Sequence, residues 1–104
     1  MHSSVPVTGE YEPETALSRS FEIVNKRGLH ARASAKFVQL VDSYNAHVRV
    51  SKDGMTVGGT SIMGLMMLAA SPGCCIDVSA SGVQADAVLD ALQALVADKF
   101  GEEC

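Results

Sequence analysis

Large aromatic side chains and long apolar runs are scarce in this chain of 104 residues. Tryptophan is absent and aromatic residues make up 5%, which argues against a base-stacking surface for single-stranded nucleic acid. No apolar run approaches the roughly 20 residues of a membrane-spanning helix, so we expect no membrane insertion. The formal net charge of −4 argues against general binding of nucleic acid. With 47% hydrophobic and 19% charged residues, the composition is that of one globular domain.

Cysteine is too rare for a disulfide framework. Of the three cysteines, Cys74 and Cys75 are adjacent and Cys104 is the last residue, so the count is odd. The sequence contains no Cys-x-x-Cys and no His-x-x-x-His spacing, which are typical of zinc sites. We therefore expect reduced thiols in a cytoplasmic protein, with no metal and no cofactor.

The first 18 residues differ in character from the rest. They mix proline, glycine, serine and acids without an apolar period, so we expect residues 1–18 to be a disordered acidic tail. Glu10, Glu12 and Glu14 and the lack of an apolar core segment also argue against a secretory signal. The ordered domain is predicted over residues 19–104.

Apolar periodicity in this domain predicts the element order β-α-β-β-α-β-α, with a short second helix. The strands are expected near residues 20–25, 46–51, 55–57 and 74–81, and the helices near 31–45, 62–70 and 84–99. Asp53-Gly54 between the second and third strands is a two-residue hairpin signal. Clear alternation in three strands predicts an α+β fold, a two-layer open-faced sandwich. Its four-stranded antiparallel sheet would carry the helices on one face.

Positive charge is concentrated at the start of the first predicted helix. Four of the eight Lys and Arg residues fall within residues 26–36, and no acid lies between Glu22 and Asp42. Because a first helical turn ordinarily favours acids, Arg32 there opposes the helix dipole. Arg32 and the unpaired backbone N–H groups of the helix start together predict a phosphate-sized anion site.

His30, at or next to the N-cap, would reach the mouth of this anion site. Basic neighbours favour the neutral, nucleophilic form of a histidine, and histidine forms covalent intermediates. Gly28 would let the preceding loop bend tightly and leave the ring uncovered. The residue pattern leaves two interpretations open, an anion site or an ordinary N-cap on a solvated basic face, and it does not identify a reaction.

Two stretches of the chain, GLHARASA at 28–35 and SIMGLMML at 61–68, stand at a characteristic separation. They resemble the active-site motif and the second signature of the HPr family, the histidine-containing phosphocarrier proteins of the bacterial phosphotransferase system. The resemblance implies a carrier that is not itself an enzyme. His30 would receive a phosphoryl group on Nδ1 from Enzyme I and pass it to an Enzyme IIA, with Arg32 assisting.

Further site residues are expected from the helix start and from the resemblance. The backbone of Ala31 and Ala33 at the helix start would support the anion site. The resemblance implies that Ser61 is a regulatory site for HPr kinase/phosphorylase. A short helix that is apolar all round cannot bury every side, and flexible methionines suit a surface that meets several partners. The residues expected to dock Enzyme I and Enzyme IIA are Ile62, Met63, Leu65 and Met66.

One departure from the family concerns Ala33, which stands where the family usually has proline. Together with the acidic tail, it favours a regulatory, nitrogen-related branch of the relay. Two other classes stay open. A ligand-sensing or regulatory module controlled by phosphorylation of Ser61 would need a pocket with convergent polar groups. A small hydrolase would need a Gly-x-Ser-x-Gly elbow, which the sequence lacks. We expect a monomer.

Overall fold

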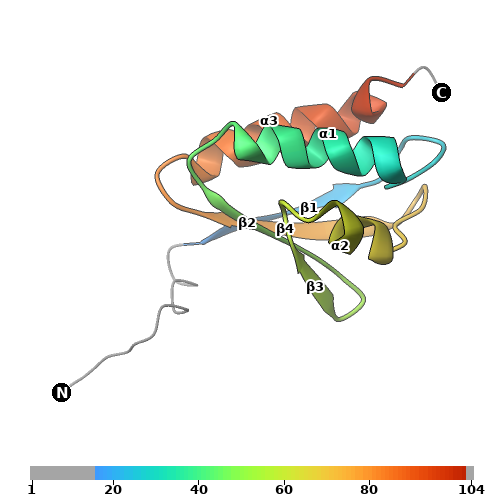
Figure 1. Cartoon of the computed structure of the whole chain (residues 1–104), viewed down its shortest axis with the longest axis horizontal. Helices are drawn as coiled ribbons and strands as arrows, with labels where there is room; N and C mark the ends of the chain where they lie inside the picture. The colour runs from blue at the N-terminus through green and yellow to red at the C-terminus, as the bar shows by residue number, and fades with distance from the viewer. Residues whose placement is uncertain (1–15, 103–104) are drawn as a thin grey trace.

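The computed structural model describes residues 16–102 as a layer of strands under a layer of helices (Figure 1). The elements in chain order are β1 (Leu17–Glu22), α1 (Ala31–Asp42), β2 (His47–Lys52), β3 (Met55–Gly58), α2 (Ile62–Met67), β4 (Cys75–Ser81), α3 (Ala85–Ala97) and a 3-10 turn (Lys99–Gly101). The predicted order and the α+β class are confirmed. No helix among the described residues is long and apolar enough to cross a bilayer.

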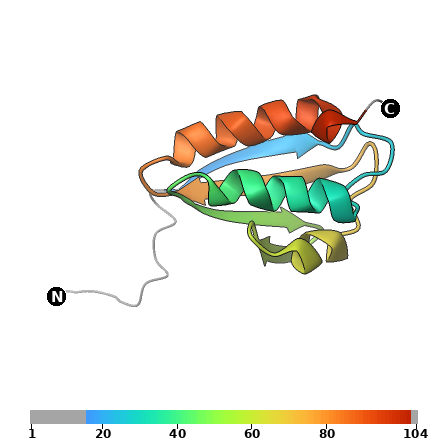
Figure 2. The same ribbon diagram turned by 45° about the horizontal axis from the view of Figure 1, so that its top comes forward.

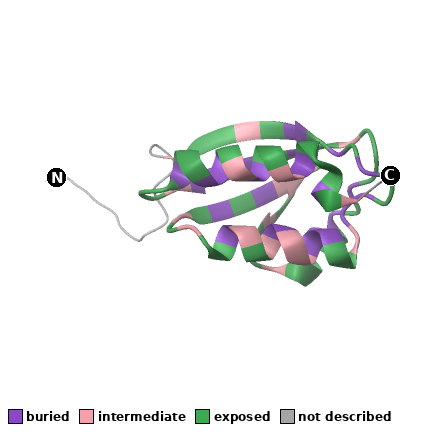
Figure 3. Cartoon of the chain, turned by 90° about the horizontal axis from the view of Figure 1, so that it is seen from above, coloured by how far each residue is buried: buried purple, intermediate pink, exposed green. Residues whose placement is uncertain are grey.

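All strand pairs are antiparallel, and the strand order is β1-β4-β2-β3. Along β4, Ile76, Val78 and Ala80 are buried while Cys75 and Asp77 are exposed, which is the alternation of a sheet with one covered face. Figure 3 shows this change of burial along the ribbons. Helices α1 and α3 lie side by side over the covered face (Figures 1 and 2).

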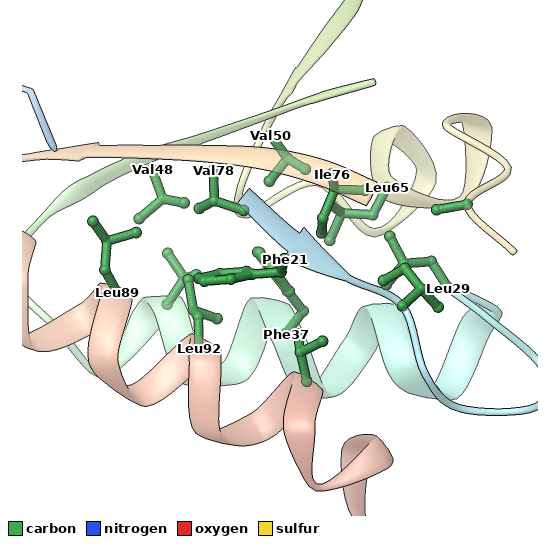
Figure 4. Close-up of a cluster of buried hydrophobic side chains, with 14 of the residues drawn as sticks. Phe21, Leu29, Phe37, Val48, Val50, Leu65, Ile76, Val78, Leu89 and Leu92 are labelled. Carbon is green, nitrogen blue, oxygen red and sulfur yellow. The ribbon is translucent and has the colours of Figure 1, made fainter. Parts of the chain in front are cut away.

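The core fills the space between the sheet and these two helices. Figure 4 shows Phe37 of α1 and Leu92 of α3 in one cluster with Val78 of the sheet, and all three are fully buried. Burying such a side chain contributes about 1.5–3 kcal/mol. Leu89 of α3 is also fully buried, because the helix presents a broad apolar face to the core.

The first strand lies earlier in the chain than the sequence pattern predicts. It begins at Leu17, which pairs with Ala80 of β4, and it ends at Glu22 rather than at Asn25. The predicted boundary at residue 18 is therefore wrong, because backbone pairing with β4 includes two residues of the expected tail. Residues 1–15 of that tail lie outside the described part of the chain.

The helices end earlier than predicted. Helix α1 ends at Asp42 instead of Asn45, and α3 ends at Ala97 instead of Lys99. Helix α2 ends at Met67 because Ala69 adopts a left-handed φ of 53° that no helix can continue.

The predicted hairpin turn is confirmed, with left-handed φ values of 52° and 85° at Asp53 and Gly54. Strand β4 begins at Cys75, one residue after its predicted start.

Candidate functional site

His30 is the N-cap of α1, as the sequence predicts. Its backbone is extended, with φ −79° and ψ −176°, and its ring Nδ1 accepts a hydrogen bond from the Arg32 backbone N–H at 3.3 Å. The first helical bond runs from the Ser34 N–H to the His30 carbonyl oxygen at 2.9 Å. The ring therefore lies at the N-terminus of the helix, with Nδ1 directed at the Arg32 N–H.

The first turn of α1 offers further donors to an anion. Within residues 16–102, the N–H groups of Ala31 and Ala33 have no acceptor in hydrogen-bonding distance, and the first turn carries no acid. A proline at position 33 would lack this N–H, so Ala33 adds a donor to the helix start. The Arg32 side chain is exposed, and among the described residues it makes no ion pair.

Gly28 allows the loop before His30 to pack against the chain that follows α2. Its φ is +66°, and an added Cβ would lie 2.2 Å from the Ala70 carbonyl oxygen. The same oxygen accepts a hydrogen bond from the Leu29 N–H at 2.9 Å, and the Leu29 side chain is buried. The loop conformation that presents His30 thus requires glycine at position 28.

A carboxylate that no sequence pattern predicted lies on the other side of the ring. Oε2 of Glu102 is 2.5 Å from Nε2 of His30, and Oε1 accepts a hydrogen bond from Nδ2 of Asn25 at 3.1 Å. The hydrogen bond with His30 holds the pKa of the Glu102 carboxyl below its usual value; burial opposes this shift, while Asn25 and Arg27 reinforce it. The helix start is free of acids in sequence, yet the fold brings one acid to it.

The chain reaches this position through a left-handed turn after α3. Lys99, Phe100 and Gly101 have φ values of 58°, 56° and 77°, a conformation that costs about 1–2 kcal/mol for each residue other than glycine. Phe100 is buried in the core, and Nζ of Lys36 donates to its carbonyl oxygen at 2.6 Å. Lys36, one of the four basic residues near His30 in sequence, is therefore directed at this turn. Figure 2 shows the turn beside the loop that precedes α1.

Ser61 is the N-cap of α2. Its Oγ accepts a hydrogen bond from the Gly64 N–H at 2.9 Å, and its side chain is partly exposed. Gly64 is buried, and an added Cβ there would lie 2.9 Å from the same Oγ. Ser61 thus stabilises the helix start by itself, and its phosphorylation stays a prediction.

The residues predicted on the docking surface divide into two groups. Ile62, Met63 and Met66 are exposed, Met63 to 71%, whereas Leu65 is fully buried. The prediction for Leu65 is wrong, because this side of α2 faces the core and lies near Ile76 (Figure 4). The prediction omits Met67, which is 64% exposed. Its spacing of four residues from Met63 places both on one helix face and would have identified it.

Known proteins share this fold and these motifs. A family model described as the PTS HPr component phosphorylation site matches residues 17–98. Phosphocarrier protein HPr of Cupriavidus necator is 46% identical over 86 residues, which cover 83% of this chain and 97% of that protein. Phosphocarrier protein NPr of Shewanella violacea is 40% identical over 88 residues, covering 85% and 97%.

A solved structure agrees with these relatives. The crystal structure of HPr-C-His from Thermoanaerobacter tengcongensis superposes with a TM-score of 0.80 at 41% identity, covering 85% of this chain and 99% of that chain. Both the predicted fold and the predicted resemblance are confirmed. The chain belongs to the HPr family, the phosphocarrier proteins of the phosphotransferase system, which carry phosphoryl groups between partners rather than catalyse a reaction of their own.

Proposed function

We propose that Nδ1 of His30 accepts a phosphoryl group from Enzyme I and delivers it to an Enzyme IIA. The observation that carries this proposal is the position of Nδ1, which faces the Arg32 N–H at the start of α1 while Nε2 contacts Glu102. In transfer, the long hydrogen bond from the Arg32 N–H to Nδ1 breaks, and the freed Nδ1 lone pair forms a bond to phosphorus. The bond between phosphorus and the donor breaks, and its electron pair leaves with the donor. The group would then lie at a helix N-terminus, which favours anions.

Arg32 acts on the phosphoryl group in transit. Its guanidinium is exposed beside the helix start, and a charge-assisted hydrogen bond to phosphate contributes about 1.5–3 kcal/mol. Arg32→Ala should therefore slow transfer by about one to two orders of magnitude, because each 1.4 kcal/mol is tenfold. Since the side chain is exposed, the melting temperature should stay close to that of the wild type.

The test is phosphoenolpyruvate-dependent labelling by Enzyme I, followed by treatment with acid. The wild type should take up acid-labile phosphate, and His30→Ala should take up none while it keeps its fold. His47→Ala is the matched control, because His47 is exposed on β2 and should be dispensable. Label retained in His30→Ala would show that another residue is the acceptor.

We assign regulation to Ser61 and docking to the exposed side chains of α2. Helix α2 packs against α1, and the Leu29–Ala70 hydrogen bond ties the loop of His30 to the chain after α2. A partner that covers the exposed face of Met63 and Met66 would therefore meet His30 nearby. HPr kinase/phosphorylase is the proposed modifying enzyme for Ser61, and we expect the carrier to act as a monomer.

The branch of the relay depends on which Enzyme I is the preferred donor. Ala33 and the relative named NPr support the nitrogen-related branch, whereas several relatives of higher identity bear the name HPr. Transfer rates from nitrogen-type and sugar-type Enzyme I decide between them. A clear preference for the sugar-type donor would refute the nitrogen-related assignment.

A ligand-sensing module has less support than a carrier. A hollow between β1 and α3 is lined by apolar residues and by the polar side chains of Ser20, Glu22 and Gln93. The side-chain oxygen of Gln93 already accepts a hydrogen bond from Arg19. The charged and hydrogen-bonding groups around His30 form a more connected set, which favours the carrier over a metabolite pocket in this hollow.

A further inference from the structure

The carboxylate of Glu102 is held from several sides. One oxygen accepts from Asn25 at 3.1 Å, and the other lies 2.5 Å from Nε2 of His30. Asn25 is fully buried, and its Nδ2 also donates to the Gly28 carbonyl oxygen at 2.9 Å. The Glu102 side chain is only 17% exposed. Acidic side chains are mostly solvated unless they are paired, so these contacts define a built site.

The backbone before Glu102 is shaped to bring it there. The left-handed run from Lys99 to Gly101 reverses the chain after α3, and the buried ring of Phe100 anchors it. Nζ of Lys36 donates to the Phe100 carbonyl oxygen, and a Cβ on Gly101 would lie 3.1 Å from that same nitrogen. Strained backbone of this kind persists only where the surrounding structure holds it, and it concentrates at functional sites.

The contacts of the imidazole ring define where its proton lies. Nδ1 accepts from the Arg32 N–H, so Nδ1 carries no proton. A carboxylate can only accept, so the hydrogen between Nε2 and Glu102 belongs to the ring. The neutral ring is then the tautomer with its proton on Nε2 and its lone pair on Nδ1, which is the nucleophilic arrangement at the helix start.

We infer that Glu102 is a positioning residue that fixes this tautomer of His30 and stabilises the positive charge of the ring while Nδ1 carries a phosphoryl group. The charge follows from the balance of the step. Nδ1 forms the bond to phosphorus, the donor keeps the electron pair of the bond that breaks, and Nε2 keeps its proton. The ring therefore becomes cationic, and the ionised Glu102 lies against it. The stabilisation of charge during transfer rests on the proposed function of His30, whereas the fixation of the ring tautomer does not.

The experiment compares the wild type with Glu102→Gln, Glu102→Asp and Asp98→Asn. Glu102→Gln removes the charge at nearly constant shape, and Glu102→Asp keeps the charge on a shorter side chain. Asp98→Asn is the matched control, since it removes one carboxylate from the same segment at an exposed side chain without a cap hydrogen bond. Two quantities are measured for each, together with the melting temperature as a check on folding.

The first quantity is the ¹⁵N chemical shifts of the His30 ring in the unphosphorylated protein at about pH 8.5, where an ordinary histidine is neutral. The wild type should show a protonated Nε2 and an unprotonated Nδ1. Glu102→Gln should move both shifts toward a tautomer mixture, Glu102→Asp should recover part of the difference, and Asp98→Asn should match the wild type. Equal shifts in the wild type and Glu102→Gln would overturn the assignment.

The second quantity is the rate of phosphoryl transfer from Enzyme I. Replacing a charged acceptor by a neutral one should slow transfer about tenfold in Glu102→Gln, with no change in Asp98→Asn. A shifted tautomer with an unchanged rate would overturn the claim of charge stabilisation. Failure of the wild type to accept phosphate on His30 would refute the proposed function instead, and the ring shifts would still test the role of Glu102.

Discussion

Gly28 offers a sharp test of how the loop of His30 is held, through the substitution Gly28→Ala. An alanine at φ +66° costs about 1–2 kcal/mol relative to a right-handed residue. Its Cβ would lie 2.2 Å from the Ala70 oxygen, so that carbonyl must move and the Leu29 hydrogen bond weakens. An unsatisfied buried group costs about 1–3 kcal/mol more. The free energy of unfolding should therefore fall by about 2–5 kcal/mol, and the melting temperature by about 10 °C or more.

The matched control for this substitution is Gly54→Ala. Gly54 is also left-handed, with φ +85°, but nothing lies within 4 Å of an added Cβ. Both variants carry the backbone cost and the same entropic gain from restricting the unfolded chain, so the difference between them isolates the contact with Ala70. Urea denaturation gives both free energies of unfolding. Equal destabilisation of the two variants would refute the argument from close approach.

The loop contact should also affect function, since Gly28 is two residues from His30. A displaced loop moves the ring relative to Glu102 and the helix start, so Gly28→Ala should slow transfer from Enzyme I even where it is fully folded. Gly54→Ala should transfer at the wild-type rate. The comparison is made at a temperature well below both melting temperatures, so that unfolding does not contribute.

Two further predictions concern the second helix. Changing Met63 and Met66 together to Glu should weaken binding to Enzyme I and Enzyme IIA with little change in melting temperature, because both are exposed. Leu65→Ala should instead lower the free energy of unfolding by about 2–5 kcal/mol, since Leu65 is fully buried. If the double methionine variant loses as much stability as Leu65→Ala, the docking surface lies elsewhere. Ser61→Asp should slow transfer from Enzyme I at low salt and less at high salt, because the added charge faces partners that dock at a basic site. Ser61→Ala loses the acceptor for the Gly64 N–H and about 0.5–2 kcal/mol of stability, yet it should transfer phosphate at the wild-type rate. Equal transfer rates for the wild type and both Ser61 variants at low salt would refute the regulatory role.

The features that the sequence determined by itself are local ones. Alternation along β4, the left-handed turn at Asp53-Gly54 and the N-cap at His30 each follow from residues within one or two turns of backbone. The physical causes are the side-chain period, the steric limits on φ and the unpaired donors at a helix start. Each acts over a few residues, so it can be predicted from the local sequence. The two motifs around His30 and Ser61 belong to the same local class.

The tertiary structure alone decided which distant residues meet. Glu102 is 72 residues from His30 in the sequence. Its contact with His30 depends on the buried Phe100 and on the left-handed turn at residues 99–101, which the hydrophobic periodicity of the sequence does not predict. Leu65 has the same local environment in sequence as its exposed neighbours, and only the packing of α2 against the core distinguishes it. Local preferences of the chain cannot specify such contacts, because many arrangements of the same helices and strands are equally compatible with those preferences. The packed core selects one arrangement, and with it the acid that lies against the histidine.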